Sequence, residues 1–433
     1  MSIKKDFLIN LLFIFIPFTY IAGNLLLNLN VLLIIILAFI FYGLQIFKEK
    51  LTIVDKLFIL LFFYIVTIGV INHYYNNNNP SNLVLVKSIS YVRFLLLYFI
   101  LKFLVQKNII NYKYIFLSFG SASIFVIFDL IVQFYFDKDI FGYVATKNLR
   151  RLGGPFGDEL IAGSFIQRFF IFSLYFVLLF INFNKEKFYK FSLLLIMAFS
   201  FIGIFLAGNR MPIILFLFIL ILFFLLEKIL RKQSIIIMFI SLLAVSIPIS
   251  LNPNTLSHYT HLVKVVDDTK DYFIKRFKSE KIDDIPNSYA KDIETGILVW
   301  QQNKFTGGGI KSFYFNCAKI KNSPMDKYGG ANCNTHPHNY YLQIAAELGA
   351  FGLLLVITIF LLIAWNSIKI VLFSSKNTIN RILMPFFLVF IAEIFPLKTT
   401  GSFFTSANST FLFIIIAFIV GLLQLEKKIG YEK

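Results

Sequence analysis

Runs of roughly twenty apolar residues recur along the whole chain, and they constrain its fold more than any other feature. A helix needs about 20 mostly apolar residues to cross the hydrocarbon core of a bilayer. The chain has 433 residues, 58% of them hydrophobic, and a mean hydropathy of +0.77. A soluble domain with this composition would expose large apolar patches to water. The sequence therefore predicts an all-α, polytopic membrane protein.

Twelve segments are apolar enough to be interpreted as membrane spans. Their expected bounds are 7–27, 31–47, 57–72, 83–105, 114–136, 160–182, 189–207, 212–226, 234–250, 339–364, 381–397 and 405–424. The long loop 251–338 is too short for a sizeable core of its own, and the helical periodicity of 289–302 indicates helices that lie on the membrane surface. We expect residues 1–250 to hold nine spans, 251–338 to form the loop, and 339–433 to hold three spans.

Basic residues fall mainly on alternate short loops. These residues are Lys4, Lys5, Lys48, Lys50, Lys56, Lys107, Lys113, Lys185, Lys187, Lys190, Lys228, Arg231, Lys232, Lys369, Lys376, Arg381, Lys427, Lys428 and Lys433. Loops 28–30 and 73–82, on the other side, have no Lys or Arg. Because basic short loops stay in the cytoplasm, we expect both termini there and loop 251–338 outside. The net charge of +18 thus reports orientation, and we do not expect nucleic-acid binding.

The two cysteines, Cys317 and Cys333, both lie in the loop that is expected outside. An oxidising compartment allows such a pair to form a disulfide, and the short gap between them is easily closed. We expect the bridge; the alternative is two unrelated free thiols.

Ionisable residues inside spans are costly and tend to be functional. Five fall in the outer halves of the expected spans: Lys87, Arg93, Asp129, Arg168 and Glu393. Lys102 lies near a cytoplasmic end, where its long side chain can snorkel to the interface. This asymmetry predicts a polar cavity that opens outward. The alternative is a set of buried ion pairs, Arg93 with Asp129 and Arg168 with Glu393.

Further cations lie in the short outside loops. Arg150 and Arg151 precede a Gly-rich turn, and Arg210 stands at the start of a helix with Pro212 two positions later. Helix N-termini and guanidinium groups both favour phosphate oxygens. The alternative for Arg210 is an anchor at the membrane interface. The loop 398–408 is rich in hydroxyl groups, as sugar-binding surfaces can be.

Two acidic pairs in the long loop, Asp267-Asp268 and Asp283-Asp284, resemble the beginning of a metal site. Neither pair is followed by the further oxygen ligands that a divalent cation needs, and Lys270 and Lys281 lie close by. We expect solvated helical faces and no metal.

His338 is the most informative single residue, because histidine exchanges a proton near neutral pH. His258, His261 and His336 lie in the same loop, where a histidine is usually a solvated side chain. His338 differs because an apolar helix follows it at once. Small residues in that helix permit close packing, which would fix the direction of the imidazole.

The pattern His338-Asn339, nine residues, then Gly349-x-x-Gly352-Leu353 resembles the signature of the O-antigen ligase/O-antigen polymerase superfamily, which are bacterial membrane glycosyltransferases. The layout of twelve spans with a large loop between the ninth and the tenth is also similar. The resemblance covers most of the chain, but it does not separate ligases from polymerases.

Two other segments resemble the family. The segment Trp300…Lys304-Phe305-x-Gly307-x-Gly309…Phe313 is similar to the stretch upstream of the family's histidine, although Lys304-Phe305 stands where a proline is common. Arg210, after Gly208-Asn209, resembles the family's functional arginine in a short periplasmic loop.

The resemblance implies transfer of a glycan from undecaprenyl diphosphate to a hydroxyl group at the periplasmic face of the bacterial inner membrane, without metal, nucleotide sugar or other cofactor. His338 would be the general base. The departing diphosphate would need cations: Arg210, with Arg150 or Arg151, and Arg93 or Arg168. Displacement in one step would invert the anomeric centre. The lipid tail would lie between apolar spans.

The acceptor stays open. Ligation of O-antigen to lipid A–core is the first interpretation, and a polymerase that joins O-antigen or exopolysaccharide repeat units on the growing glycan is the second. A protein O-oligosaccharyltransferase is third. A flippase for lipid-linked glycans would need charges reaching the cytoplasmic half and has no use for His338. A purely structural membrane protein would not need outward-facing arginines.

Overall fold

A computed structural model describes residues 2–75, 81–145, 151–181, 186–227, 253–278, 285–320, 333–373, 378–399 and 401–431. The expected span 234–250, Arg150 and Asp283-Asp284 lie outside these residues. The described chain is helical, and its only β-pairing consists of two isolated bridges, Lys138 with Val144 and Asn339 with Thr399.

The α-helices are α1 (Ser2–Ala22), α2 (Asn24–Tyr42), α3 (Ile53–Tyr75), α4 (Ser81–Tyr91), α5 (Arg93–Gln106), α6 (Tyr112–Phe136), α7 (Ala162–Phe180), α8 (Glu186–Leu206), α9 (Arg210–Leu226), α11 (Pro253–Phe277), α12 (Ser288–Gln302), α13 (Phe313–Cys317), α14 (Tyr340–Phe373), α15 (Thr378–Glu393) and α16 (Ser406–Tyr431). Short 3₁₀ turns, η1 (Gly43–Phe47) and η2 (Gly154–Phe156), extend α2 and precede α7. Among the described residues, nine segments are long and apolar enough to cross a membrane, with α4 and α5 counted as one.

Each expected span within the described ranges overlaps a helix, but several bounds differ. The expected loop 28–30 is wrong: these residues lie within α2, and the break between the first two helices falls at Gly23, whose φ of 104° suits glycine. The span expected at 339–364 continues as α14 to Phe373. The span expected at 83–105 is divided into α4 and α5 by a break at Val92. The span expected to reach residue 397 ends at Glu393. Pro396 explains why α15 ends early, because a proline lacks the N–H that a helix needs and disfavours helical backbone at the preceding residue.

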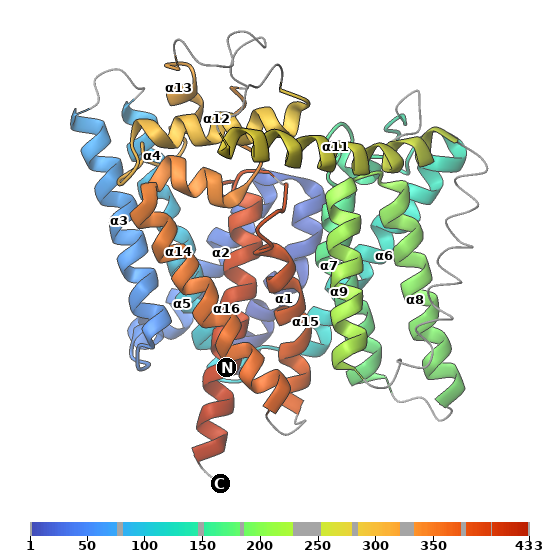
Figure 1. The fold of residues 1–433 in the computed structure, drawn as a ribbon. Coiled ribbons are helices and arrows are strands. Elements are labelled where there is room, and N and C mark those ends of the chain that lie inside the picture. The colour runs from blue at the N-terminus through green and yellow to red at the C-terminus, as the bar shows by residue number, and fades with distance from the viewer. Residues whose placement is uncertain are drawn as a thin grey trace.

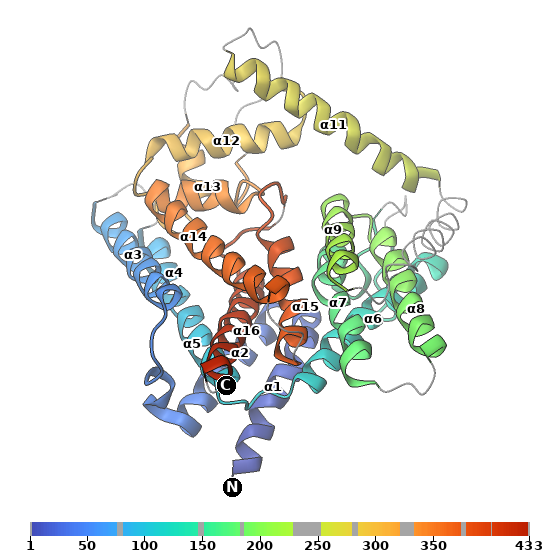
Figure 2. The same ribbon diagram turned by 60° about the horizontal axis from the view of Figure 1, so that its bottom comes forward.

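The membrane helices form one bundle, and the two described ends of the chain lie at the same end of it (Figure 1). The helices of the long loop, α11, α12 and α13, lie at the opposite end (Figure 1). Both α11 and α12 run across that end rather than into the bundle, as the second view also shows (Figure 2). The long loop is therefore helical where it is described.

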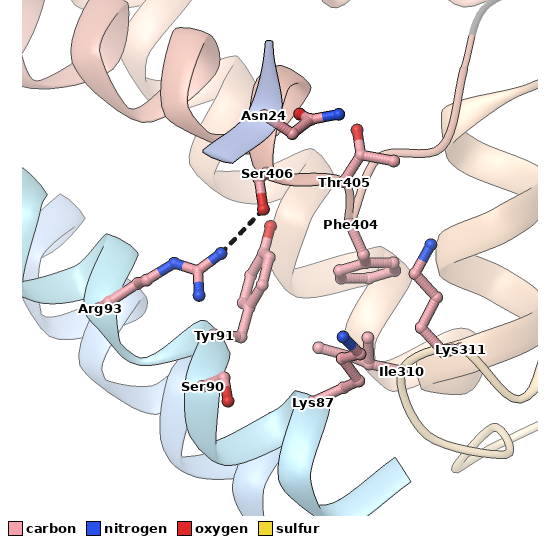
Figure 3. A pocket seen from close by; sticks show the side chains of 10 residues that line it. All are labelled: Asn24, Lys87, Ser90, Tyr91, Arg93, Ile310, Lys311, Phe404, Thr405 and Ser406. Atoms are coloured by element: carbon pink, nitrogen blue, oxygen red, sulfur yellow. Dashed lines mark hydrogen bonds between the residues drawn. The ribbon is translucent and has the colours of Figure 1, made fainter. Parts of the chain in front are cut away.

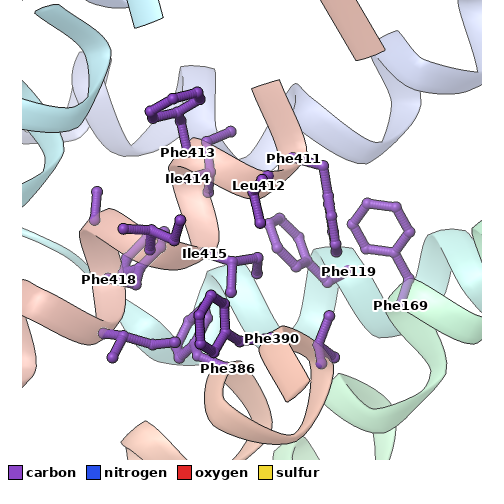
Figure 4. Packing of buried hydrophobic residues seen from close by; sticks show 14 of the residues in the cluster. Phe119, Phe169, Phe386, Phe390, Phe411, Leu412, Phe413, Ile414, Ile415 and Phe418 are labelled. Carbon is purple, nitrogen blue, oxygen red and sulfur yellow. The ribbon is translucent and has the colours of Figure 1, made fainter. Parts of the chain in front are cut away.

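The centre of the bundle is α16, whose residues 409–423 are all buried. Phenylalanines from α6, α7 and α15 surround it (Figure 4). Phe418 stacks on Phe386 of α15 with ring centroids 4.6 Å apart. Gly421 allows α5 to pack closely against α16, because a Cβ there would lie 2.6 Å from Val105 Cγ1. Lipid tails are as apolar as the helix surfaces, so the hydrophobic effect does not drive these helices together. Aromatic packing and close contact at small residues stabilise the bundle instead.

The expectation that Lys102 snorkels to the interface is wrong. Its side chain is 3% exposed, and its Nζ lies 2.7 Å from Asp55 Oδ2, which is fully buried. Tyr98 donates to the other carboxylate oxygen at 2.6 Å. Asp55 lies 47 residues away in the sequence, so no local pattern indicates a counter-charge for Lys102. A buried ammonium needs one, and α3 provides it.

Candidate active site

His338 lies between the long loop and α14, and its backbone is left-handed, with φ +51°. This conformation is uncommon outside glycine and persists where the surrounding structure imposes it. The imidazole is half-buried, and its ring centroid lies 4.4 Å from that of His336. Pro337 is buried against α12, where a Cβ on Gly296 would lie 3.2 Å from Pro337 Cβ. The histidine is therefore held from the α12 side.

Asn339 fastens the start of α14. Its Oδ1 accepts from the backbone amides of Tyr341 at 3.0 Å and Leu342 at 3.1 Å, which caps the helix. Its Nδ2 donates to the carbonyl of Pro396 at 2.8 Å, and its backbone pairs with Thr399. One side chain thus both ends the loop and ties it to the turn after α15. His338 is adjacent, so its position follows from these contacts.

Gly349 marks a break inside α14, with φ +67° and ψ −174°, a conformation that is essentially restricted to glycine. The backbone of residues 304–309 crosses the helix at this point. A Cβ on Gly349 would collide with the Phe305 carbonyl and lie 2.5 Å from Thr306 N, and one on Gly307 would lie 2.5 Å from Glu347 O. Both glycines are therefore required by a backbone-to-backbone crossing.

Hydrogen bonds seal this crossing. Ala350 donates to Lys304 O at 2.8 Å and Gly309 to Glu347 O at 2.7 Å, so backbone groups freed by the break find partners. Tyr64 of α3 donates to Leu348 O at 2.9 Å. Gly352 lies beside the same tyrosine, because its Cβ would be 3.3 Å from Tyr64 Cε1. The two glycines of the sequence motif hold α14 in place rather than contact the imidazole.

The disulfide joins Cys317 and Cys333, the first of the two alternatives. Both cysteines belong to a small apolar cluster with Val299 of α12 and Ala346 of α14. The disulfide therefore connects α13 to the loop segment that leads into His338.

Arg168 is an ion-pair residue in this fold. Its Nε lies 2.8 Å from Glu393 Oε1, and Lys398 Nζ lies 2.6 Å from the other carboxylate oxygen. Arg168 Nη2 also donates to Asn408 Oδ1 at 2.8 Å. The pKa of Lys398 is lowered to about 8 overall. Burial lowers this pKa, and the Glu393 carboxylate offsets only part of the effect. The pairing that the sequence offered as an alternative is present, and diphosphate binding by Arg168 stays a prediction.

The cluster of Arg168, Glu393 and Lys398 lies close to the start of α14, two residues after His338. Lys398 Nζ stands 5.3 Å from the ring centroid of Tyr340, the first residue of α14. Lys398 also directly precedes Thr399, which pairs with Asn339. Sequence reasoning placed Lys398 only in a hydroxyl-rich loop. The signal that it missed was the spacing of five residues from Glu393, which brings a cation back onto a buried carboxylate across a proline turn.

Arg93 does not pair with Asp129, so that alternative is wrong. Its Nη2 donates to Ser406 Oγ at 2.9 Å and to Asn28 Oδ1 at 3.2 Å, whereas Asp129 Oδ1 accepts from the amide of Ile140 at 2.8 Å. Arg93 instead lines a cavity together with two lysines (Figure 3). Of the five outer-half ionisable residues, this cavity gathers Lys87 and Arg93.

Arg210 begins α9, as expected, and it is half-buried. The preceding Asn209 fixes this helix start, because its Nδ2 donates to Leu160 O at 3.0 Å and its Oδ1 accepts from Gly163 N at 3.2 Å. The start of α9 therefore lies against the start of α7. Arg151 is half-buried in the loop just before α7.

A family model described as O-antigen ligase matches residues 193–357. The matched region runs from α8 into α14 and includes Arg210, His338, Asn339, Gly349 and Gly352. The match supports the O-antigen ligase/polymerase superfamily. This superfamily implies glycan transfer of the O-antigen ligase or polymerase type, and the apolar helices make the chain a multi-pass membrane protein. No curated protein matches the chain.

Proposed function

We propose that the protein transfers a glycan from undecaprenyl diphosphate to a hydroxyl group of lipid A–core at the periplasmic face of the bacterial inner membrane. The observation that carries the proposal is the fixed, half-buried His338 at the start of α14, within the region matched by the O-antigen ligase family. The proposed orientation places α11–α13 in the periplasm and both termini in the cytoplasm, in agreement with the basic short loops.

His338 would act as the general base. The acceptor oxygen attacks the anomeric carbon as the imidazole takes the hydroxyl proton, and the bond from that carbon to the diphosphate oxygen breaks. The electron pair of this bond leaves with the lipid diphosphate. Attack opposite to the leaving group inverts the anomeric centre. No metal ion takes part in this scheme.

The leaving diphosphate gains negative charge and therefore needs cations near the membrane surface. Arg210 suits this role because it starts α9, and helix N-termini and guanidinium groups both bind phosphate oxygens. Arg151, in the loop before α7, is proposed as a second contact, and Arg150 as its neighbour in sequence. The diphosphate would then lie near the joint start of α7 and α9, with its lipid tail between apolar helices.

The base assignment is tested by glycan transfer in membranes that contain His338→Ala or, as the matched control, His336→Ala. The first variant should lose about 10²–10⁴-fold in rate at unchanged expression, and the control should keep most of its activity. Retained transfer by His338→Ala, or a larger loss in His336→Ala, would overturn the assignment. Arg210→Ala should weaken the use of the diphosphate donor.

The acceptor is tested by a surface-polysaccharide gel from a deletion strain. Ligation predicts loss of all polymer from lipid A–core, with carrier-linked polymer retained. A single repeat unit on the core would instead identify a polymerase. Complementation of the deletion strain with the wild-type chain should restore the polymer on lipid A–core, and complementation with His338→Ala should not.

A further inference from the structure

A cavity of about 370 Å³ lies between the start of α2, the junction of α4 and α5, and two loops at residues 310–311 and 404–406. Its ten lining residues include three cations, Lys87, Arg93 and Lys311, and no carboxylate. Figure 3 shows Arg93 beside Ser406 at one edge and the two lysines near the other, with Tyr91 and Phe404 between them. We call this the three-cation cavity.

Within the described residues, no carboxylate lines the three-cation cavity, although the buried Glu347 carboxylate lies near enough to interact with the charge of Lys311. Arg93 Nη2 donates only to neutral oxygens, those of Ser406 and Asn28, and its Nε is buried without a hydrogen-bond partner in the part of the chain that is described. Within the same part, neither Lys87 nor Lys311 forms a salt bridge. Arg93 and Lys311 are half-buried, whereas Lys87 is exposed at the edge. Grouped cations repel one another, most strongly where they are partly desolvated, so the arrangement favours an anion among them.

The backbone is shaped to bring Lys311 into this place. Gly309, with φ +85°, lets the loop approach α4, because a Cβ there would collide with Val84. Lys311 itself is left-handed, with φ +69°. Long side chains rarely adopt this conformation, and such residues gather at ligand sites. The same glycine-rich loop crosses α14 at Gly349, so the cavity and the His338 helix share one support.

The floor of the cavity is rigid and apolar. The rings of Tyr91 and Phe404 meet edge to face with centroids 5.3 Å apart, and the hydroxyl oxygens of Ser409 and Tyr91 are hydrogen-bonded at 3.0 Å. Hydroxyl groups of Ser90, Thr405 and Ser406 line the cavity as well. Cations and hydroxyl donors above a fixed floor suit a phosphate group, and a guanidinium binds phosphate in a fork geometry.

The three-cation cavity is separate from Arg210. It is built on α2, α4, α5 and the start of α16, whereas α9 packs on α7, α8 and α15. Both views place α4 and α9 on opposite sides of α16 (Figures 1 and 2). The cations that the sequence suggested as one diphosphate site are therefore divided between two places.

We propose that Lys87, Arg93 and Lys311 form a second phosphate-binding site, which takes a phosphate group of a lipid-linked substrate. The naming of the substrate rests on the proposed function; the binding of phosphate does not. Two sources share this chemistry, the diphosphate of the glycan carrier and a phosphate on the acceptor lipid. A transferase that holds two membrane-bound substrates has a use for anion sites on both sides of its base.

Binding is measured by equilibrium dialysis of the full-length protein in detergent against radiolabelled inorganic pyrophosphate. Lys87→Gln and Lys311→Gln should each weaken binding at this site by about tenfold to a hundredfold, the usual range for loss of a charged contact. The matched control is Lys304→Gln, which removes an exposed lysine from the same loop outside the cavity. Lys311→Gly removes the same charge at a position whose left-handed backbone glycine adopts without strain, so equal losses of binding in Lys311→Gln and Lys311→Gly assign the effect to the lost charge.

Unchanged pyrophosphate binding in both cavity variants, or an equal loss in Lys304→Gln, would overturn the site. The source is then read from transfer kinetics of Lys311→Gly. A raised KM for the donor assigns the carrier diphosphate, a raised KM for the acceptor assigns a phosphorylated acceptor, and no change in either overturns the substrate assignment. His338→Ala should bind pyrophosphate normally. If His338→Ala retains glycan transfer while Lys311→Gly loses pyrophosphate binding, the proposed general base is refuted and the phosphate-binding site is still supported.

Discussion

Replacing Gly349 with alanine should separate the two demands that this position meets. The residue has a backbone conformation restricted to glycine, and it also lies where the 304–309 backbone crosses α14. Gly23, between α1 and α2, provides the control, because its φ of 104° and ψ of 172° fall in the same region while a Cβ there meets nothing within 4 Å. Gly23→Ala therefore reports the conformational cost alone.

The expected magnitudes differ accordingly. The unfavourable backbone conformation costs about 1–3 kcal/mol in either variant. At Gly349 the added methyl group also collides with the Phe305 carbonyl, and forced overpacking costs about 1–3 kcal/mol. If the loop moves aside, the bond from Ala350 to Lys304 is weakened, at about 0.5–1.5 kcal/mol. Gly349→Ala should thus lose about 2–4 kcal/mol more than Gly23→Ala, or roughly 30- to 700-fold in the unfolding equilibrium.

The assay is reversible unfolding in mixed SDS micelles, followed by tryptophan fluorescence. Trp300 reports locally, because its Nε1 donates to Lys304 O at 2.9 Å, next to the crossing. Gly349→Ala should unfold at lower SDS than Gly23→Ala and should shift the Trp300 emission before global unfolding. Equal losses of stability in the two variants would refute the crossing as the reason for this glycine.

Two further stability predictions follow from single contacts. The double variant Cys317→Ser/Cys333→Ser should lose about 3 kcal/mol, the value for a loop of this length; reductant should lower the wild-type melting temperature to that of the variant, and an unchanged melting temperature would mean that the bridge does not stabilise the fold. Glu393→Gln leaves two buried cations without a counter-charge and should lose about 3–5 kcal/mol in denaturant unfolding, whereas Glu49→Gln, which breaks more exposed pairs, should lose under about 1 kcal/mol; similar losses would contradict the buried network.

Helix positions followed from the sequence because each depends on a local property, the apolar run that a bilayer requires. Local signals also explain the exceptions. Pro396 was visible, and it ends α15 at Glu393 even though the apolar run continues. The break at Gly349 was not read, because a glycine within an apolar run suggests close packing of helices as readily as a change of backbone. Only the segment 304–309, distant in sequence, decides between these interpretations.

Partners of charged residues were harder to predict, because they depend on which helices become neighbours. Arg168 with Glu393 was offered as an alternative and is present, whereas Arg93 with Asp129 was offered equally and is wrong. Both pairs join residues of opposite charge in outer halves of spans, so composition cannot rank them. Lys311 was missed as a further cation of the cavity that Arg93 lines, because it lies in the long loop, outside any span. Burial and contact, rather than charge, distinguish these cases.

The position of His338 depends on groups that are themselves held by charge. Asn339 anchors to the carbonyl of Pro396, and that turn is fixed from below by the contact of Lys398 with Glu393. Glu393 in turn holds the guanidinium of Arg168. A change at Arg168 can therefore reduce glycan transfer by moving the turn, without any contact to a substrate. Loss of activity alone cannot assign Arg168 to diphosphate binding, whereas a change in donor KM at normal stability can.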